Sequence, residues 1–403
     1  MILTTGQPFW ITERGLVRYP VLTEDVTCDV VIVGGGISGA MLGYYLTRAG
    51  LRAVVLEQRY VGAGSTSAST AMLQYELDEN LVDLRKKVGV ARANEAYLAN
   101  LYGVHGVAHL CQHELPTDCG LRYCHSLYLA SRPTDAAAVE EEGDARRGIG
   151  ISNEFLPEAE LLRRFQLKSP AALYSADTAE VNPYELTHTL LQQAQLAGLR
   201  VFERTEALRY EVNSGGKSVT LHTAGGHKVR AGHVVVCTGF AAADLVPRDI
   251  VNLHSTYVVL SRPGQADALP TGDAQLWETA RPYIYTRRTP DGRIMIGGRD
   301  EVIKQSTFQN ALLENKADKL EKQFQELFDQ PIAFTRDFVW AGVYGETDDS
   351  LPYIGQHPDF PQVWFALGYG GNGTTYSLLA AEIIRDALTG RQHRYASTFG
   401  FER

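Results

Sequence analysis

Three glycines are spaced as in a turn that holds the phosphates of a nucleotide. Gly34, Gly36 and Gly39 follow the apolar run 29–33 and precede a stretch typical of a helix. In this spacing the first glycine permits a tight turn, the second lets the backbone approach a pyrophosphate, and the third lets the helix pack on the strand. The helix N-terminus would add free N–H groups and partial positive charge. The pattern therefore predicts a dinucleotide site.

A carboxylate stands where the ribose of a dinucleotide needs one. Glu57 follows a second short apolar run, 53–56, about 20 residues after the glycines. Such an acid accepts both hydroxyls of an adenosine ribose and would repel a 2′-phosphate, so NADP is disfavoured. Strand, turn, helix, second strand and acid follow in order, which favours dinucleotide binding over the alternative, a glycine-rich turn in a Rossmann domain that binds nothing.

The segment after Glu57 favours FAD over NAD. Residues 62–70 consist only of Gly, Ala, Ser and Thr. Small hydroxylic side chains can wrap a long dinucleotide and hydrogen-bond its phosphates and ribityl chain, whereas an NAD domain would normally continue into another helix. The alternative, a flexible surface loop, is disfavoured because the run follows directly on the ribose acid.

A second glycine series lies further along the sequence. Gly368, Gly370 and Gly373 separate an apolar run, 363–367, from a helical one, 374–388. No further strand and ribose acid follow, so we do not expect a nicotinamide site there. We expect this turn to aim the helix N-terminus at the flavin ring, where the dipole would stabilise negative charge at the N1–C2=O edge of the reduced flavin.

Two phenols and a guanidinium alternate along a short segment. In a strand, Tyr283, Tyr285 and Arg287 would share one face. Arginine can pair a carboxylate bidentately while tyrosine hydroxyls orient it, so this face could clamp a small anion. The alternative is a solvated sheet face on which Arg287 pairs with a surface acid.

Other patterns point away from metal and dithiol chemistry. His105, His109 and His113 recur every four residues, as zinc ligands on a helix do, but Gly103 and Gly106 interrupt that helix and no matching acid or Cys pair is evident. The five cysteines include no C-x-x-C pair. We therefore expect no metal site and a reducing, cytoplasmic compartment.

The bulk composition is that of a globular protein. The 403 residues, 44% of them apolar and 21% charged, fit two domains of ordinary size. A net charge of −9 without a basic run disfavours nucleic acid as a partner. The stretch 30–47 is uncharged and nearly long enough to span a membrane, but its glycines favour strand, turn and helix, so we expect no transmembrane segment. Residues 1–14 show no signal peptide.

The elements that must position these residues alternate between strand and helix. We expect strands at 29–33, 53–56, 124–130, 200–203, 233–237, 338–343 and 363–367, and helices at 38–49, 91–113, 135–147, 183–196, 312–329 and 374–388. Residues 206–230 read as hairpins with turns at 213–216 and 225–226, residues 250–300 as strand-rich, and residues 1–26 as an irregular arm. Neither a repeat nor a linker separates the parts, so two domains should be interleaved in sequence.

With these motifs in place, the chain resembles the D-amino-acid oxidase superfamily of FAD-dependent oxidoreductases, near the glycine and sarcosine oxidases. The resemblance extends over most of the chain and rests on segments 33–39 with Glu57, 65–70, 235–239, 287–298, 340–342, 348–355 and 368–373. It implies an α/β (α+β) fold in which a Rossmann-type FAD-binding domain is interleaved with a sheet-based substrate domain. We expect an N-terminal arm at 1–26, an FAD-binding domain at 27–84, 155–240 and 338–395, and a substrate domain at 85–154 and 241–337.

The resemblance also implies an activity. Family members oxidise the C–H bond of a small amine or amino acid by hydride transfer to flavin N5, and oxygen or another acceptor reoxidises the flavin. The alternatives are an FAD-dependent 2-hydroxy acid or alcohol dehydrogenase, and a flavin-binding subunit of a larger dehydrogenase complex.

Two departures from the family pattern refine the expectation. Arg287 matches the arginine that holds the substrate carboxylate in glycine-oxidase-like enzymes, but Tyr344 stands where many of them carry a second arginine. This favours a secondary or N-substituted amine with an anionic group over a plain α-amino acid. Residues 300–345 contain no Cys and residues 58–80 no His, the positions at which relatives attach FAD, so non-covalent FAD is expected.

Motifs and resemblance together predict the residues of the site. Those expected to act on the substrate are Arg287, Tyr285, Tyr344 and Tyr283. Those expected to contact FAD are Gly34, Gly36, Ile37, Ser38, Gly39, Glu57, Gln58, Ser65, Thr66, Ser67, Ala68, Ala207, Thr238, Gly239, Gly342, Gly370, Gly371, Asn372, Gly373 and Thr374.

Overall fold

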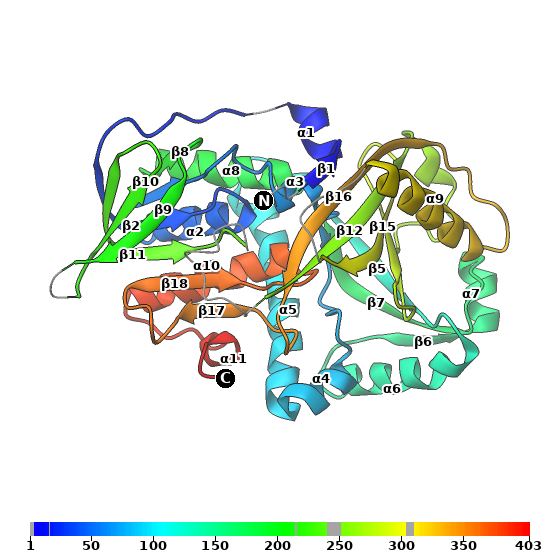
Figure 1. Cartoon of the computed structure of the whole chain (residues 1–403). Coiled ribbons are helices and arrows are strands. Elements are labelled where there is room, and N and C mark those ends of the chain that lie inside the picture. The colour runs from blue at the N-terminus through cyan, green and yellow to red at the C-terminus, as the bar shows by residue number, and fades with distance from the viewer. Residues whose placement is uncertain (1–3, 16, 214–215, 240–250, 304–309) are drawn as a thin grey trace.

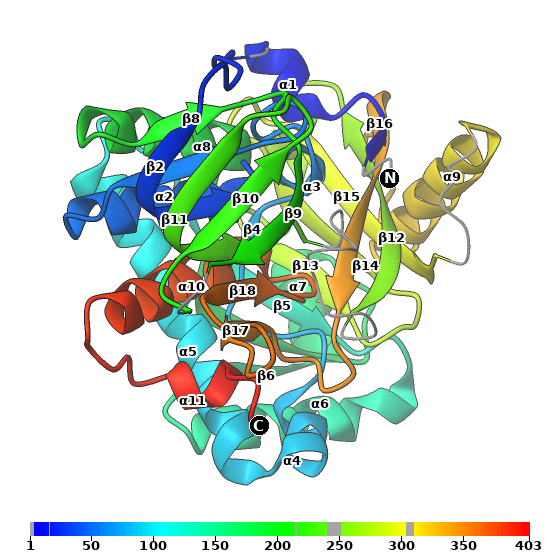
Figure 2. The ribbon, with the colours of Figure 1, turned by 60° about the vertical axis from the view of Figure 1, so that its left-hand side comes forward.

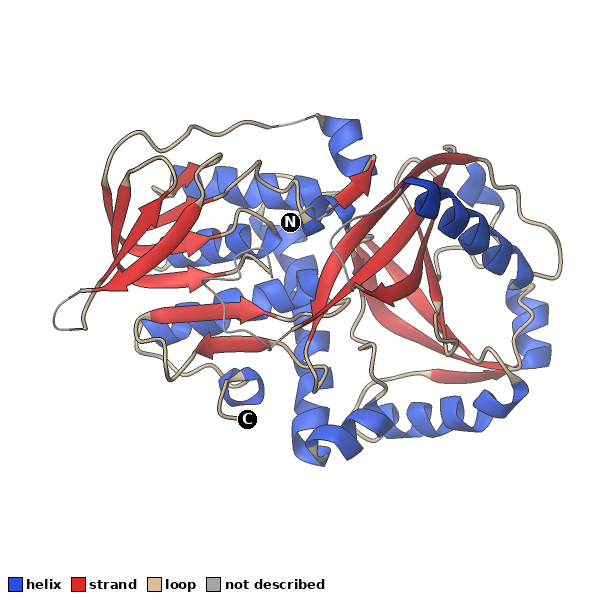
Figure 3. Cartoon of the chain, in the orientation of Figure 1, coloured by secondary structure: helices blue, strands red, loops and turns tan. Residues whose placement is uncertain are grey.

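Two β-sheets divide the molecule, and the chain passes repeatedly between them (Figures 1 and 3). The computed structural model describes residues 4–15, 17–213, 216–239, 251–303 and 310–403. Helices lie against both sheets, as the α/β (α+β) class predicts. The fold class inferred from the sequence is therefore confirmed.

The first sheet is built around the predicted strand–turn–helix unit. Its strands run in the order β17-β18-β11-β2-β3-β8, with β10 pairing both β11 and β9. β18, β11, β2, β3 and β8 are parallel, whereas β17, β9 and β10 pair antiparallel. Their bounds are β2 (Val26–Val33), β3 (Ala53–Leu56), β8 (Arg200–Phe202), β9 (Ala207–Val212), β10 (Val219–Thr223), β11 (Lys228–Val236), β17 (Tyr353–Gln356) and β18 (Val363–Leu367). The hairpin of β9 and β10 extends the sheet toward the viewer in Figure 2.

Alternate residues of β2 pack into different layers, because successive side chains of a strand point to opposite faces. Val30 and Ile32 join a core made largely of helices, whereas Val31 and Val33 pack with the hairpin. The helices of that core are α2 (Ile37–Arg48), α5 (Val90–His109), α8 (Pro183–Leu196) and α10 (Gly373–Leu388), and the short α11 (Ala396–Phe399) lies near β17. α5 continues into a π-helical turn at Leu110–Glu114.

The two glycines that interrupt the pattern of α5 have a packing role. A β-carbon on Gly103 would lie 3.0 Å from the backbone oxygen of Thr375, and one on Gly106 would lie 2.9 Å from Leu378. Both neighbours belong to α10. The glycines therefore permit close contact between two helices, and they do not end α5.

The second sheet is longer and mostly antiparallel. Its order is β1-β16-β12-β15-β14-β13-β5-β7-β4, with β6 added to β7, and only β13 and β5 pair in parallel. The bounds are β1 (Thr4–Gly6), β4 (Met72–Leu73), β5 (Arg122–Leu129), β6 (Glu154–Pro157), β7 (Ala171–Glu180), β12 (Asn252–Ser261), β13 (Gln275–Glu278), β14 (Ile284–Arg288), β15 (Ile294–Val302) and β16 (Arg336–Glu346). α9 (Asn310–Glu326) packs on β12, β15 and β16. The remaining helices are α1 (Phe9–Arg14), α3 (Ser65–Ala68), α4 (Leu81–Val88), α6 (Ala136–Arg147) and α7 (Glu158–Phe165), with single turns at Pro133–Asp135 and Gln265–Ala268.

The two sheets are interleaved along the chain, as the sequence predicts. Several segments, however, belong to the other part of the molecule from the one expected. β7 and β16 lie in the second sheet. The expected FAD-binding ranges, 155–240 and 338–395, had included β7 and most of β16. α5, assigned to the substrate domain, packs on α10. Strand pairing joins residues far apart in the chain, so local patterns cannot assign such strands to a sheet. The expected boundary at residue 240 and the turn at 214–215 lie outside the described residues.

The N-terminal segment is ordered where it is described, contrary to the irregular arm expected. β1 pairs with β16, and α1 follows it. Phe9 and Trp10 are buried, and the Trp10 indole N–H donates to the carbonyl of Ser69 at 2.8 Å. The aromatic pair in the arm thus anchors it to the segment that follows α3.

A buried ion network holds α6 against the segment that precedes α4. The fully buried guanidinium of Arg146 contacts Glu142 at 2.8 Å and Glu76 at 3.0 Å. Glu142 also accepts the backbone N–H groups of Leu81 and Val82, the first two residues of α4. Such a network stabilises only while it is complete, because a buried charge without its partner is costly.

We therefore expect Arg146→Met to lower the free energy of unfolding by about 3–5 kcal/mol, because it strands two buried carboxylates. Urea unfolding followed by circular dichroism measures the loss. Arg147→Met is the matched control: Arg147 pairs with Asp144 on the same helix but is exposed, so less than about 1 kcal/mol should change. Equal effects of the two substitutions would contradict a structural role for the network.

Candidate functional site

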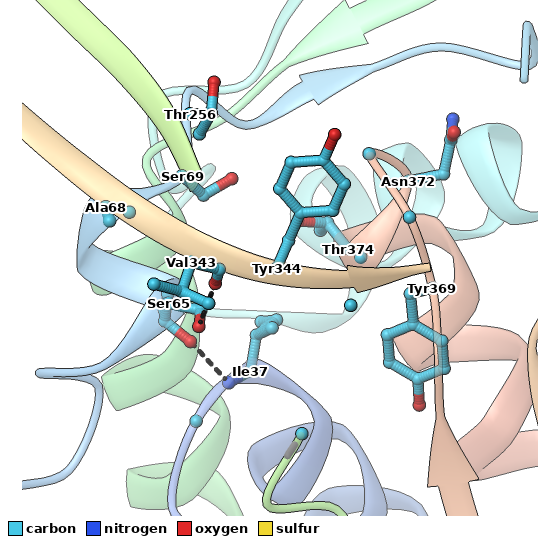
Figure 4. Close-up of a pocket in the computed structure, with 18 of the residues that line it drawn as sticks. Ile37, Ser65, Ala68, Ser69, Thr256, Val343, Tyr344, Tyr369, Asn372 and Thr374 are labelled. Atoms are coloured by element: carbon cyan, nitrogen blue, oxygen red, sulfur yellow. Dashed lines mark hydrogen bonds between the residues drawn. The ribbon is translucent and has the colours of Figure 1, made fainter. Parts of the chain in front are cut away.

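One cavity joins the two sheets and contains most of the residues expected from the sequence. It extends from the glycine turn after β2, past the start of α10, to side chains of β12, β14, β15 and β16. Figure 4 shows part of this wall, with Ile37 at the start of α2, Tyr344 on β16 and Asn372 and Thr374 beside α10. The cavity therefore has a nucleotide-turn end and a second-sheet end.

The glycines at the first end are required by close contacts. Gly34 has a φ of +115°, and a β-carbon there would lie 2.6 Å from the backbone oxygen of Cys237. A β-carbon on Gly39 would lie 1.9 Å from the oxygen of Gly34, so this glycine serves packing and does not line the cavity. Gly36 does line the cavity, and its β-carbon would meet the hydroxyl of Thr66 at 3.0 Å.

Glu57 is held in place by the backbone around it. It accepts the N–H of Gly35 at 2.9 Å and the N–H of Arg59 at 2.8 Å. Burial raises the pKa of Glu57, while these two N–H groups oppose the shift. The carboxylate lines the cavity at the end of β3, where the sequence predicts a partner for ribose hydroxyls.

The hydroxylic segment forms the short helix α3 and joins both ends of the cavity. The hydroxyl of Thr66 accepts the N–H of Ile37 at 3.0 Å, and the hydroxyl of Ser65 donates to the carbonyl of Val343 at 2.9 Å (Figure 4). The indole of Trp340 donates to the carbonyl of Ala68 at 2.9 Å. The segment is therefore tied to α2 on one side and to β16 on the other.

The second glycine turn is also fixed. The amide of Asn372 donates to the carbonyls of Gln74 and Glu76, both at 3.0 Å, and the N–H of Gly371 donates to Asp78 at 3.1 Å. Gly370, Gly371, Gly373 and Thr374 line the cavity at the start of α10. The helix thus directs its N-terminus toward the cavity, as the sequence predicts.

Three tyrosines line the other end. The hydroxyl of Tyr344 donates to Asp300 at 2.9 Å, and that of Tyr283 donates to Asp78 at 2.8 Å. The hydroxyl of Tyr285 lies 3.1 Å from that of Thr256. The phenols expected to face the substrate are therefore together, and each has a defined polar partner.

Asp300 has an unusual environment in this group. It lies near the end of β15 and lines the cavity; its Oδ2 accepts the Tyr344 bond, while its Oδ1 is shielded and has no hydrogen-bond partner among the described residues. Loss of solvent raises the pKa of Asp300 to about 6, although nearby hydroxyls of Thr256, Tyr344 and Tyr283 lower it in part. The carboxylate thus titrates close to neutral pH.

Arg287 does not line the cavity, which departs from its expected role as a substrate anchor. Its guanidinium donates to the carbonyls of Thr70, Ala71 and Val181 at 2.7–3.0 Å and pairs with Glu180 at 3.0 Å. Only 2% of the residue is exposed. All three carbonyls accept from Nη1, and Nε donates to the carbonyl of Arg288 at 3.0 Å, so Arg287 is engaged with the backbone outside the cavity lining, although the strand alternation that singled it out is real.

The residues predicted from the sequence fall into two groups, those that line the cavity and those that do not. Those that line the cavity are Gly34, Gly36, Ile37, Ser38, Glu57, Ser65, Thr66, Ala68, Thr238, Gly239, Gly342, Gly370, Gly371, Asn372, Gly373, Thr374, Tyr283, Tyr285 and Tyr344. Those outside it are Gly39, Gln58, Ser67, Ala207 and Arg287. Ser67 is buried and bonds to the carbonyl of Gly64, and Ala207 pairs within the β-hairpin.

Several lining residues were not anticipated, among them Asp78, Asp300, Glu76, Thr256 and Trp277. Asp300 follows the glycine pair 297–298, a segment that the sequence did single out. A β-carbon on Gly297 would lie 2.3 Å from the ring of Tyr285, so this glycine makes room for the tyrosine. Asp78 lies in an irregular segment, and no sequence pattern around it indicates a residue of the site.

Residues 29–387 match the family described as FAD dependent oxidoreductase. The chain belongs to this family. The D-amino-acid oxidase superfamily inferred from the sequence is thereby confirmed.

Named relatives of this FAD-dependent oxidoreductase act on different compounds. Glycine oxidase of Geobacillus kaustophilus (strain HTA426) is 27% identical over 370 residues, which cover 89% of this chain and 92% of that protein. Gamma-glutamylputrescine oxidoreductase of Escherichia coli (strain K12) is 24% identical over 385 residues, 94% of this chain and 87% of that protein. The crystal structure of glycine oxidase from Geobacillus kaustophilus superimposes with a TM-score of 0.78 at 23% identity, covering 94% of this chain and 99% of that one.

The residues of this oxidoreductase fit FAD, the cofactor of the family. Gly34 and Gly36 leave the space that β-carbons would fill, and Glu57 presents a carboxylate beside them. The hydroxyl of Thr238 lines the same end and is buried without a hydrogen-bond partner, as expected of a group that bonds to a ligand. Among the described residues, Cys237 is the one thiol in the lining, and no histidine lines it.

The described residues lack two further features, a cluster of metal ligands and a helix that could cross a membrane. No three His, Cys, Asp or Glu side chains gather as a metal site would require, and His105 instead lies 3.1 Å from Asp177. No described helix combines the length and the apolar character that crossing a membrane would demand.

The packing at Gly36 gives a test of the cofactor end. A branched side chain there would collide with Thr66 and fill space beside the turn, so Gly36→Val should lower the FAD content of the purified protein at least tenfold. Absorbance at 450 nm per protein measures this. Gly225→Val, in an exposed turn with no atom closer than 3.8 Å to its β-carbon, is the control. A folded Gly36→Val protein with full FAD would contradict the placement of the cofactor.

The raised pKa of Asp300 has a consequence for stability. The folded state holds this proton more tightly than an unfolded Asp with a pKa near 3.9, so ionising Asp300 costs stability as pH rises through about 4 to 6. Asp300→Asn should therefore be more stable than the parent at pH 8, by on the order of 2 kcal/mol, with a smaller gain at pH 5. Urea unfolding at both pH values tests this. Asp273→Asn, at an exposed position outside the cavity, is the control, and a gain for Asp300→Asn that is equal at both pH values would contradict the raised pKa of Asp300.

Proposed function

We propose that the protein oxidises the C–H bond beside the nitrogen of a small amine or amino acid, with loss of a hydride to flavin N5. The observation that carries this proposal is the single cavity, which runs from the nucleotide turn to a face of tyrosines and carboxylates. The relatives named glycine oxidase and gamma-glutamylputrescine oxidoreductase support an amine or amino-acid substrate. Bound FAD would take up the hydride and pass two electrons to oxygen or another acceptor.

Residues at the two ends of the cavity would have different roles, cofactor binding at one end and substrate binding at the other. The glycine turn after β2, Glu57 and the hydroxyls of α3 would hold the dinucleotide, and the start of α10 would face the flavin ring. Non-covalent attachment is supported by the lining, since its one described thiol, Cys237, is buried and bonded to carbonyls of the glycine turn. Tyr283, Tyr285 and Tyr344 would orient the substrate above the ring.

The division into domains that this proposal needs follows the two sheets. We place FAD on the sheet of β2, β3, β8, β11 and β18, and the substrate on the sheet that contains β12 and β14–β16. The domain boundaries expected from the sequence must then be changed, so that β7 and β16 belong to the substrate domain. Gly342, on β16, still reaches the cofactor side through its contact with Ala68.

An alcohol or 2-hydroxy acid substrate is the main alternative. The carboxylates at the second-sheet end argue against it, because an amine carries a positive charge at neutral pH and an alcohol does not. A 2-hydroxy acid would bring a further negative charge to the same place.

Anaerobic reduction of the bound flavin tests the proposal. The holoenzyme is mixed with primary amines, secondary amines, amino acids, alcohols and 2-hydroxy acids, and absorbance at 450 nm is followed. At least one amine or amino acid should bleach the flavin, and acid precipitation should leave FAD in the supernatant. Bleaching by an alcohol or 2-hydroxy acid alone would overturn the proposed function. Bleaching by none of the compounds would favour a flavin-binding subunit that needs its complex.

A further inference from the structure

Two carboxylates at the second-sheet end of the cavity have no cationic partner among the described residues. Asp78 accepts hydrogen bonds from the hydroxyl of Tyr283 and the N–H of Gly371, at 2.8 and 3.1 Å. Asp300 accepts one from the hydroxyl of Tyr344 at 2.9 Å, and its Oδ1 is shielded without a partner. Both residues are half-buried, and a carboxylate partly withdrawn from water is stabilised by a counter-charge, so this pair lacks what a ligand could provide.

Other buried carboxylates nearby do have cations. Glu76 lines the same cavity, and Arg146 pairs with it at 3.0 Å while Ser126 donates at 2.8 Å. Glu180 lies just outside and is paired with Arg287 and Arg122. Among the described residues, the acids that support the structure are therefore neutralised by cations, whereas Asp78 and Asp300 are not.

The lining also lacks a group that could hold an anion by charge. No Lys, Arg or His side chain is among the described residues of the cavity wall. Arg287, the cation expected there, donates to three carbonyls and pairs with Glu180. The carboxylate of an α-amino acid would meet two negative charges and no positive one, whereas an ammonium group would meet two attractive partners.

We propose that this end of the cavity binds an alkylammonium substrate, a monoamine or diamine with no carboxylate on the carbon to be oxidised, through Asp300 and Asp78. The inference rests on the proposed amine oxidation and names its substrate class. It replaces the anionic substrate expected from Arg287.

In the proposed reaction Asp300 also accepts a proton from the substrate. Loss of a hydride from carbon requires the lone pair of a neutral amine, so the ammonium must first give up one proton. Asp300 accepts that proton from nitrogen; the adjacent C–H bond then breaks, its electron pair and hydrogen leave as hydride to FAD, and a C=N bond forms. FAD is reduced by two electrons and the amine is oxidised to an iminium ion, which water hydrolyses. The pKa of about 6 at Asp300 makes such a transfer less uphill than for an ordinary aspartate.

The charges around Asp300 come from several elements. Tyr283 just before β14, Tyr285 on β14, Tyr344 on β16 and Asp78 before α4 lie near it. His254 of β12 stacks on Tyr344 and lies 3.6 Å from Glu346. The charge of Asp78 hinders ionisation of Asp300, whereas the hydroxyls of Tyr344 and Tyr283 favour it. A bound ammonium would bring a positive charge to these two carboxylates.

A matched pair of substrates tests the proposal in the holoenzyme. Norvaline, in both enantiomers, is n-butylamine with a carboxylate on the reacting carbon, so the two differ in the feature at issue. We expect kcat/KM for n-butylamine or putrescine to exceed that for norvaline at least a hundredfold. For the amines it should fall as pH drops below about 6, where Asp300 becomes protonated.

Variants then assign the effect to the carboxylates. Asp300→Asn and Asp78→Asn keep the side-chain shape and remove the charge, so each should lower kcat/KM for n-butylamine roughly tenfold to a hundredfold, which is what loss of one charge-assisted hydrogen bond predicts. Asp300→Asn should also abolish the inflection near pH 6. Asp273→Asn, outside the cavity, should change neither quantity. Thermal melting and FAD content confirm that each variant is folded, and if Asp300→Asn does not fold, Asp78→Asn decides the charge requirement alone.

The possible failures are distinguishable. Preference for norvaline or glycine over n-butylamine, or Asn variants as active as the parent, would overturn the alkylammonium assignment and leave amine oxidation standing. Flavin reduction by no amine and no amino acid would overturn the proposed function itself, and this inference with it.

Discussion

The buried guanidinium of Arg287 is the interaction on which the shape of the cavity depends. A cation removed from water needs hydrogen-bond acceptors and a counter-charge; here three carbonyls accept from Nη1, the carbonyl of Arg288 accepts from Nε, and Glu180 provides the negative charge. The three carbonyls belong to residues 70, 71 and 181, so one side chain of β14 holds the segment after α3 against the end of β7. That segment carries the hydroxyls of the cofactor end. The side chain of Arg287 thereby joins the second sheet to the segment that leads from the cofactor end of the cavity.

The use of this cation in the structure determines the charge of the site. With Arg287 bound to the backbone, the second-sheet end of the cavity contains carboxylates and phenols alone among its ionisable described residues. Asp78 links this end to the cofactor, since it bonds both to Tyr283 and to the N–H of Gly371 beside the start of α10. A substrate that contacts Asp78 therefore lies against the same turn that directs the helix N-terminus into the cavity.

The sequence predicted the parts of the fold whose signals are local. β3, β18 and α8 begin and end where the pattern indicated, and β2, α2 and α10 differ by a few residues, because glycine turns and apolar periodicity delimit them. β7, with the sequence AALYSADTAE, gave no clear alternation and was missed; its place in the sheet comes from pairing with β5, β4 and β6. Arg287 shows the same limit at the site. Strand alternation correctly placed it with Tyr285, but its partners lie more than 100 residues away in the chain. Asp78 and Asp300 belong to the cavity only through such distant contacts.

Three consecutive residues of β16 serve different parts of the cavity. Gly342 makes room for Ala68, the carbonyl of Val343 accepts the hydroxyl of Ser65, and Tyr344 reaches Asp300. The first two contacts depend on the absence of a side chain and on the backbone, so a substitution at position 344 can leave both intact. If the proposed function holds, a single substitution at position 344 changes the substrate end while the contacts of Gly342 and Val343 persist, and a scaffold of this kind can acquire new substrates in evolution without first losing its cofactor.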